Sequence, residues 1–342
     1  MKTNNKKTSG RKIAAIIIAV VVVLGLLWVA PFFLSGASAD ATVHLHKGST
    51  LSAVQDSVAK PLGDAFASRV TTLLKLSGSD VSRRQGAFDV KTGDSPFSVA
   101  RHLRSGAANG VKFTFNNLRT KRELADRIAS RFMMGDSIYA ALNDTAVCAK
   151  FGKTPDNIVT IFIPDSYEFY WDITVDQLLN RMNEYYTKFW TDSRKAKAAK
   201  LGISPDDAQI VASIVEEETA KSDERGKVAR LYLNRLKSGM PLQADPTVKF
   251  ALGDFSIKRI TVPMTKVNSP YNTYRSAGLP PGPIRLPEKA TIDAVLNAPA
   301  HNYTYMCAKE DFSGYHNFTN NYADHLANAA KYQKALDSRG IK

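Results

Sequence analysis

The chain opens with a long uncharged hydrophobic run and continues with a region in which hydrophobic and polar positions are mixed. Residues 13–34 contain no charged side chain. At a rise of about 1.5 Å per residue, a helix of this length can cross a hydrocarbon core of roughly 30 Å. We therefore predict a transmembrane helix over 13–34, preceded by a basic cytoplasmic tail over 1–12.

A cleaved signal peptide is the alternative interpretation of this run, because Ala37-Ser38-Ala39 resembles a small-residue cleavage site. The run is longer than a usual signal core, and Pro31 to Phe33 separate it from that site, which favours an uncleaved anchor. Five basic residues precede the run and none follows it directly. By the positive-inside rule, we expect a cytoplasmic N-terminus, a single pass through the membrane, and an extracytoplasmic region from about Ser35.

Three segments of the N-terminal half repeat the order strand, polar turn and capped helix. The predicted strands lie at 43–46, 86–90 and 111–115, and the helices that follow them lie at 51–58, 96–104 and 124–132. Pro96 stands at a first helical position, and Thr120 with Glu123 forms a capping-box pattern. Such units pair their strands and lay their helices on one face, which predicts an α+β fold.

The second half of the chain is mostly helical and rich in turns. Periodic patterns predict helices at about 175–190, 205–220 and 222–236, and a polar helix at the end of the chain. The aromatic stretch 158–171, which a Pro-Asp turn interrupts, is best interpreted as core material. Pro-rich and Gly-rich loops in the last third hold a rigid shape that suits a substrate groove.

Glu218 is a carboxylate where the helical pattern calls for an apolar side chain. At about 100° per residue, the β-branched residues of 210–220 point to one arc of the helix, and Glu218 falls near the middle of that arc. A carboxyl group held against apolar surface has a raised pKa and can carry a proton at neutral pH, as a general acid must. Pairing with Lys221 or Arg225 at a frayed helix end is the structural alternative.

Glu216 and Glu217 precede Glu218, and Glu216 points almost directly away from the apolar arc. Three neighbouring carboxylates raise one another's pKa, which blurs which of them titrates as the acid. Glu216 therefore remains an alternative acid, because a helix register inferred from sequence slips easily.

The net charge of +14 fits contact with acidic lipid headgroups or with the carboxylates of a cell wall, and export argues against nucleic acid as a partner. Cys148 and Cys307 would permit a disulfide in an oxidising compartment, but they define no disulfide framework and no zinc site. His44 and His46 share one face of a strand, with no third ligand near them in sequence. We therefore expect no metal and no cofactor.

Several motifs in a fixed order resemble one known family. The first group is Ala212-Ser213-Ile214-Val215-Glu216-Glu217-Glu218-Thr219-Ala220, Asn234-Arg235-Leu236, Leu242-Gln243 and Asp245-Pro246-Thr247. The second group is Ser269-Pro270-Tyr271-Asn272-Thr273-Tyr274, Gly278-Leu279-Pro280-Pro281-Gly282-Pro283-Ile284, and His316-x-Phe318 with His325. In order and spacing, from about 158 to 335, the chain resembles the MltG (YceG-like) endolytic murein transglycosylases.

The resemblance implies cleavage of the MurNAc–GlcNAc β-1,4 bond of peptidoglycan without water, leaving a 1,6-anhydro-MurNAc end. The catalytic glutamate of the family is the second Glu of a Glu-x-Glu-Thr motif, which corresponds to Glu218, although Glu217 stands where the family often carries Lys. The resemblance further implies a role on nascent strands in cell wall biogenesis, with peptidoglycan synthases as partners. It places a LysM-like subdomain at roughly 80–147 within an N-terminal region 35–147, and a YceG-like catalytic domain at 148–342.

The residues expected to bind the glycan or to fix Glu218 lie in the same motifs. They are Glu216, Gln243, Asp245, Thr247, Tyr271, Asn272, Tyr274, His316 and Asn320. Each could instead make a turn or pack, and Asp245 before Pro246 most of all. Two other functions remain open. A hydrolytic muramidase would use Glu218 as the acid and Asp245 or Glu216 to activate water, and a non-catalytic membrane-anchored protein would only bind peptidoglycan.

Overall fold

The computed structural model describes residues 4–106 and 108–340, with side chains from Lys12 onward. The chain forms two compact units. Unit 1 runs to Lys112 and also contains Glu168–Asp172, whereas unit 2 contains Phe113–Tyr167 and the chain from Ile173 onward. The boundary expected between 147 and 148 lies inside unit 2, and the segment 80–147 is divided between the two units.

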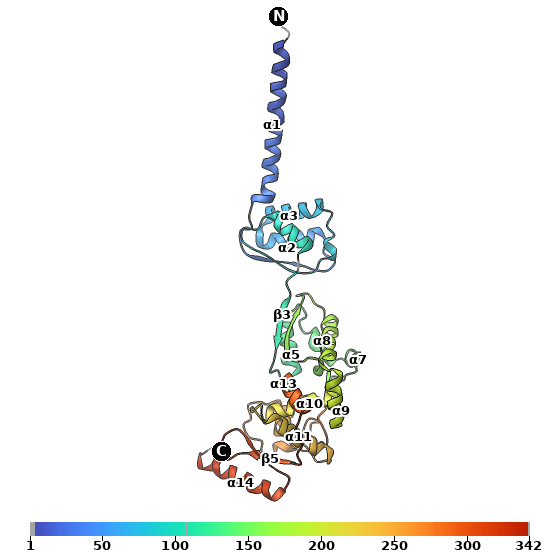
Figure 1. Cartoon of the computed structure of the whole chain (residues 1–342), viewed down its shortest axis with the longest axis vertical. Coiled ribbons are helices and arrows are strands. Elements are labelled where there is room, and N and C mark those ends of the chain that lie inside the picture. The colour runs from blue at the N-terminus through green and yellow to red at the C-terminus, as the bar shows by residue number, and fades with distance from the viewer. Residues whose placement is uncertain (1–3, 107, 341–342) are drawn as a thin grey trace. The chain divides into compact units, whose positions relative to one another are not determined.

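The N-terminal helix α1 (Asn4–Leu34) is the long blue helix of Figure 1. Its part Lys12–Leu34 has a mean hydropathy of 3.1 and is not buried within the protein, so by length and composition it can cross a membrane. Lys2 and the side chains of Lys6, Lys7 and Arg11, on which the expected orientation depends, lie outside the described residues. The length and hydropathy of Lys12–Leu34 fit a single-pass membrane anchor.

The rest of unit 1 is a small body of two strands and helices. Its elements are β1 (Ala41–Leu45), α2 (Leu51–Leu62), α3 (Asp64–Leu76), the 3-10 helix η1 (Val81–Arg83), β2 (Gly86–Val90) and α4 (Pro96–Ser105). β1 and β2 are antiparallel, with Val43 opposite Phe88, and both side chains lie in the core beneath α2 to α4. Pro96 begins α4 as predicted, after a Ser95 side chain that caps the helix. The rings of His44 and His46 lie against Trp171.

Unit 2 contains most of the helices. Its elements are β3 (Val111–Phe115), α5 (Lys121–Ala129), α6 (Ser137–Asn143), α7 (Thr145–Ala149), η2 (Ile158–Ile161), β4 (Asp165–Phe169), α8 (Val175–Phe189), α9 (Asp192–Leu201), α10 (Pro205–Glu218), α11 (Arg225–Lys237), α12 (Asp245–Leu252), η3 (Met264–Lys266), α13 (Lys289–Leu296), β5 (Tyr305–Ala308), β6 (His316–Thr319) and α14 (Tyr322–Ser338). The capping box of Thr120 and Glu123 begins α5, as predicted.

Strand pairing differs from the expectation that the three N-terminal strands pair with one another. β3 pairs with β4, and the division between the units falls within both strands. β4 is part of the aromatic stretch that was interpreted as core. Residues Ile158–Ile163 are buried, and within β4 the rings of Tyr167 and Phe169 are buried while the polar positions are exposed, so the aromatic residues up to Phe169 are core as expected. Cys148 and Cys307, both described, are free thiols.

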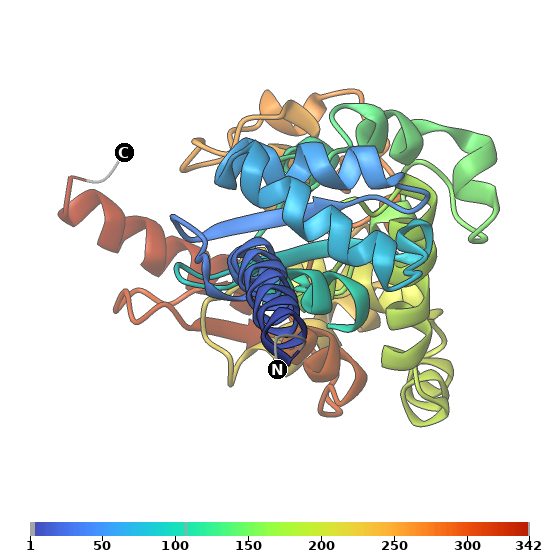
Figure 2. The ribbon, with the colours of Figure 1, turned by 90° about the horizontal axis from the view of Figure 1, so that it is seen from above.

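α10 is the central helix of unit 2. α9, α11, α12 and α13 all pack against it, and the labels of α9, α10, α11 and α13 lie close together in Figure 1. The main core cluster of the unit is built around α10, with Val211, Ile214 and Val215 fully buried. α14, coloured red, lies beside β5 at the edge of unit 2 (Figures 1 and 2). A central rigid helix that ends at Glu218 is a precise support for a functional side chain.

Candidate active site

Local sequence signals determine where α10 begins and ends. Ser204 and Asp207 form a reciprocal capping box, with Pro205 at the first helical position. The helix ends at Glu218, because Thr219 adopts an extended backbone with φ −139° and ψ 131°. Glu218 is therefore the last helical residue, and its side chain leaves the buried centre of the unit at the helix end.

The apolar arc of α10 does not separate a buried face from an exposed one. All side chains from Ala208 to Glu216 are buried, because packed helices surround α10. Glu216, expected on the opposite side from the arc, is itself only 8% exposed, whereas Glu218 is less completely buried. The helical wheel thus separated the directions of the two carboxylates correctly but did not predict that both would be enclosed.

Glu218 opens onto a polar pocket of about 260 Å³. The pocket is lined by Glu218, Leu231, Tyr232, Arg235, Gln243, Asp245, Tyr274, Met306 and His325. Glu218 comes from α10, and the other residues come from α11, from the start of α12 and the loop before it, from the segment around Tyr274, and from β5 and α14. The fold thus brings polar side chains that are far apart in the sequence together around Glu218.

The environment of Glu218 changes its proton affinity. Burial removes hydration from the carboxylate and raises the pKa of Glu218 from 4.5 to about 7. The Tyr232 hydroxyl donates a 2.7 Å hydrogen bond to Oε1 and opposes this shift, the negative charge of Asp245 adds to it, and His316 opposes it. Near neutral pH, Glu218 can therefore either donate or accept a proton.

Asp245 is the second carboxylate of the pocket. It is the first residue of α12 and is followed by Pro246 in the first turn of that helix. The Tyr274 hydroxyl donates a 2.6 Å hydrogen bond to its Oδ1, and burial together with this bond raises the pKa of Tyr274. Gln243 enters the pocket from a left-handed backbone conformation with φ 49°. Gln243, Asp245 and Tyr274, three of the candidates taken from the motifs, therefore line one pocket with Glu218.

Arg235 stabilises the loop that leads into α12. Its guanidinium group donates 2.6 Å hydrogen bonds to the carbonyl oxygens of Thr304 and Leu242, and the residue is 8% exposed. It therefore connects α11 to the loop before α12 and to the segment before β5. Tyr232 and Arg235 are both on α11, three residues apart, and so face the same side of that helix.

Other sequence candidates lie outside this pocket. Thr247 is fully buried and donates a 2.7 Å hydrogen bond to the Ala244 carbonyl. Asn272, also fully buried, donates its amide to the carbonyls of Thr265 and Val267 at 2.9 and 2.8 Å. Asn320 is exposed just before α14. Thr247 and Asn272 thus hold the loops around the pocket in place instead of facing it.

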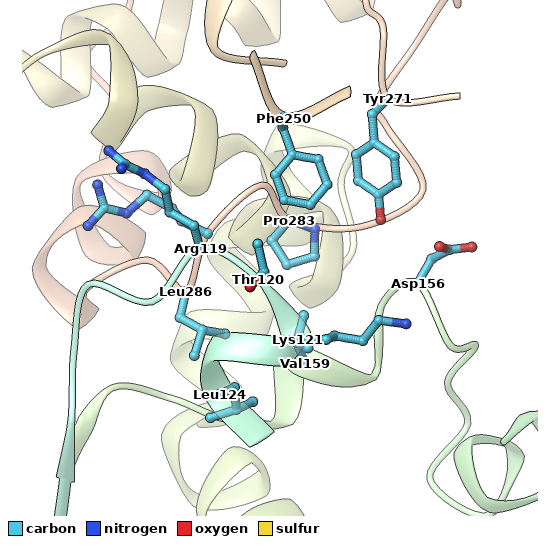
Figure 3. A pocket seen from close by; sticks show the side chains of 11 residues that line it. Arg119, Thr120, Lys121, Leu124, Asp156, Val159, Phe250, Tyr271, Pro283 and Leu286 are labelled. Carbon is cyan, nitrogen blue, oxygen red and sulfur yellow. The ribbon is translucent and has the colours of Figure 1, made fainter. Parts of the chain in front are cut away.

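Tyr271 lies at a second, smaller pocket of about 50 Å³ in unit 2. Figure 3 shows its ring beside Phe250, with the hydroxyl directed toward Asp156. Arg119 lies on the other side of this pocket in Figure 3, and Arg285 also lines it. Tyr271 is thus separated from the residues that line the Glu218 pocket.

Two arginines pair with the carboxylates that precede Glu218. Arg285 lies 3.0 Å from Glu216 and 2.7 Å from Glu217, and Arg119 lies 3.1 Å from Glu217. Glu216 also accepts a hydrogen bond from the Glu288 backbone and one from the Thr291 hydroxyl. Glu216 is thus buried in this network, whereas Glu218 is the carboxylate that lines the pocket.

His316 pairs with the buried carboxylate of Glu224. Its Nδ1 and its backbone N–H both lie 2.8 Å from the Glu224 carboxylate, which also accepts a 3.1 Å hydrogen bond from the Thr219 hydroxyl. This pair ties β6 to the residue that ends α10. Glu224 was not among the predicted site residues, because nothing in its local pattern separates it from an ordinary helix-start carboxylate.

A glutamate of raised pKa, a hydroxyl group that donates to it and a second carboxylate thus lie in one polar pocket, an arrangement suited to proton transfer. Residues 43–331 match the family described as the YceG-like family. The chain belongs to this family.

Curated relatives carry a common name. The endolytic murein transglycosylase of Bacillus subtilis (strain 168) is 33% identical over 171 residues, which are 50% of this chain and 46% of that protein. The endolytic murein transglycosylase of Streptococcus pneumoniae serotype 2 (strain D39) is 29% identical over 162 residues, 46% of this chain and 28% of that protein. The matched part therefore spans less than half of each relative's length.

A solved structure shares the fold. The 2.6 Å crystal structure of a YceG-like protein from Listeria monocytogenes matches with a TM-score of 0.55 and covers 84% of this chain and 98% of that chain. The sequence identity is 23%, so the likeness is one of fold.

Proposed function

We propose that the protein is an endolytic lytic transglycosylase that cleaves the MurNAc–GlcNAc bond of peptidoglycan with Glu218 as its catalytic acid and base. The observation that carries this proposal is the Glu218 carboxyl, whose pKa lies at about 7 in a polar pocket where Tyr232 holds it. The name shared by the Bacillus and Streptococcus relatives supports the substrate class.

The reaction needs one group that first gives and then takes a proton. Protonated Glu218 donates to the glycosidic oxygen while the bond from that oxygen to C1 of MurNAc breaks and oxocarbenium character develops at C1. The Glu218 carboxylate then accepts the proton of the C6 hydroxyl as its oxygen bonds to C1. The product is a 1,6-anhydro ring, Glu218 is protonated again, and no water is consumed.

The neighbours of Glu218 have separate roles in this proposal. Tyr232 fixes the carboxyl and tunes its pKa through the 2.7 Å hydrogen bond. Asp245, held by Tyr274, places a negative charge in the same pocket, where it stabilises the positive charge that develops on the sugar. Gln243 offers an amide to sugar hydroxyl groups.

A hydrolytic muramidase is the second candidate, because Asp245 shares the pocket with Glu218. In that case Glu218 would still be the acid, and Asp245 would activate a water molecule. Glu216 is unsuited to this role, because it is buried against Arg285. The two reactions differ in their products, an anhydro end or a reducing MurNAc end.

The cellular setting is part of the same proposal. With α1 as an anchor and the N-terminus in the cytoplasm, the pocket would act outside the inner membrane on nascent strands and terminate them beside the synthases. In this proposal the LysM-like part that binds the wall is the small compact body of unit 1 that follows α1 in the chain. The resemblance assigned this role to residues 80–147, but that segment is divided between the two units.

The test is product analysis with the full-length protein purified in detergent. Peptidoglycan is incubated with the parent and with Glu218→Gln, and the products are separated and weighed by mass spectrometry. Anhydro-MurNAc ends made by the parent alone support the proposal. Reducing ends would support the hydrolase, and a folded parent that binds peptidoglycan without cutting it would support a binding protein.

A further inference from the structure

One side of the Glu218 pocket continues into a cluster of aromatic rings at the end of the chain. His325 lines the pocket and stacks on Tyr305, with ring centroids 5.3 Å apart and planes at 25°. Tyr322 lies 5.5 Å from Tyr305 and 6.1 Å from His325. Because Tyr322 and His325 are three residues apart on α14, both rings project from its first turn.

These rings do not contribute to a hydrophobic core. None of the side chains of α14, all of them described, is buried. Tyr322 is 58% exposed and Leu326, one turn further along, is 51% exposed. Large apolar side chains gathered at a pocket edge are a mark of ligand contact, since solvent exposure costs them free energy that a ligand would recover.

One polar atom of the cluster is left without a hydrogen-bond partner. Nδ1 of His325 is buried and has no hydrogen-bond partner among the described residues. Burial and the nearby Arg235 lower the pKa of His325, so its imidazole is neutral at pH 7 and presents one donor and one acceptor. Aromatic faces beside neutral hydrogen-bonding groups match a pyranose ring, which has apolar C–H faces and hydroxyl edges.

We propose that Tyr305, Tyr322 and His325 form a subsite for one pyranose ring of the glycan strand, next to the sugar whose bond is cut at Glu218. The inference rests on the proposed function, because continuity with the Glu218 pocket identifies the occupant. His325 and the β5 residue Met306 line that pocket, and Tyr305 precedes Met306 in the same strand. A strand that reaches Glu218 therefore passes over these rings.

Tyr322→Ala is the main variant, because Tyr322 is exposed and its removal leaves the core intact. Tyr332→Ala is the matched control, since Tyr332 lies on the same helix but contacts Phe312 away from the pocket. We expect Tyr322→Ala to raise KM for glycan strands about ten-fold with kcat within two-fold, and Tyr332→Ala to change neither.

A binding measurement separates failure of this inference from failure of the proposed function. Full-length Glu218→Gln is titrated calorimetrically with stem-free peptidoglycan oligosaccharides, with and without Tyr322→Ala and Tyr332→Ala. About ten-fold weaker binding with Tyr322→Ala alone supports the subsite, even where the parent does not cleave. Unchanged affinity and unchanged KM with Tyr322→Ala, in a parent that cleaves peptidoglycan, would overturn it.

Discussion

The Tyr232 hydroxyl donates a 2.7 Å hydrogen bond to Oε1 of Glu218 and so joins the end of α10 to the middle of α11. The bond favours the ionised carboxylate, whereas burial favours the protonated one, and the balance is a pKa of about 7. A catalytic acid that must later act as a base works best with its pKa near the working pH. The pair of residues therefore sets the proton affinity on which the proposed reaction depends.

Removing the Tyr232 hydroxyl should shift the pH dependence of the reaction upward. Because its hydrogen bond lowers the pKa of Glu218, Tyr232→Phe raises that pKa, and protonated Glu218 persists to higher pH. A hydrogen bond to a charged group corresponds to about one pH unit. The profile of kcat/KM against pH measures this, with its basic limb expected to move upward.

Tyr186→Phe provides the control for this experiment. Tyr186 donates a comparable 2.8 Å hydrogen bond to Asp206, at the opposite end of α10. Its removal should leave the pH profile in place. A Tyr232→Phe profile that coincides with the parent, or moves to lower pH, would contradict the assigned role.

Replacing Glu218 should stabilise the protein at alkaline pH while abolishing activity. The pKa of Glu218 is about 7 in the folded protein and 4.5 in the unfolded chain, so the folded state binds more protons between these values. The stability that this provides is complete below pH 4.5 and is lost as the pH rises through 7. Glu218→Gln has no such loss, and above pH 7 its free energy of unfolding should exceed the parent's by on the order of 1–3 kcal/mol.

Melting of the two proteins in the same detergent at pH 4.5 and pH 8 tests this difference. We expect similar melting temperatures at pH 4.5 and a higher one for Glu218→Gln at pH 8. The exposed Glu184→Gln is the control and should show no such pattern. If Glu218→Gln were less stable than the parent at pH 8, the ionised Glu218 carboxylate would not destabilise the folded protein, and the prediction would be wrong.

Removing Arg285 should destabilise the protein strongly. Its loss leaves the buried Glu216 carboxylate without its cationic partner, which costs about 3–5 kcal/mol. Arg285→Met keeps much of the side-chain volume, so the effect reports the charge. Arg181→Met breaks an exposed pair with Glu184 and should cost less than about 1 kcal/mol. Urea unfolding compares them, and similar costs for both would contradict the assignment of Glu216 to structure.

The Thr247 hydroxyl should matter for stability and not for catalysis. It bonds to Ala244 and to Thr273 in a fully buried position. Thr247→Val leaves these groups without a partner and should lower the free energy of unfolding by about 1–3 kcal/mol. Thr247→Ser keeps the hydroxyl and should retain most of the parent's stability. Measured at a temperature where both variants are folded, kcat should equal the parent's. A large loss of kcat in folded Thr247→Val would return Thr247 to the catalytic candidates.

Thr247 also shows what could be predicted from the sequence and what could not. Motif resemblance identified Glu218, Gln243, Asp245 and Tyr274, which the fold brings together in one pocket. The same resemblance also selected Thr247 and Asn272. A motif shows which residue types occur at its positions, but it does not show whether a side chain contacts a ligand or bonds to the backbone of a nearby loop. Their full burial, which only the folded chain shows, separates the two cases.

Tyr232 was missed for a physical reason. In the helical pattern of α11, Tyr232 is indistinguishable from an apolar core residue, and only the packing of α11 on α10 brings its hydroxyl to Glu218. His325 belongs to the motifs that carry the family resemblance but was not among the predicted site residues, because a lone histidine in a polar helix carries no local signal of ligand contact. Local capping, by contrast, was predictable at Pro96 and Thr120, because it depends only on neighbouring residues.

The most direct test of the central claim is digestion of peptidoglycan in water enriched in oxygen-18. Because the C6 hydroxyl of MurNAc, and not water, is proposed to attack C1, the new ends should carry no heavy oxygen and should have the mass of anhydro-MurNAc. Glu218→Gln should produce none of them. New ends that are heavier by one oxygen-18 atom would show that water is the nucleophile, and the transglycosylase account would be wrong.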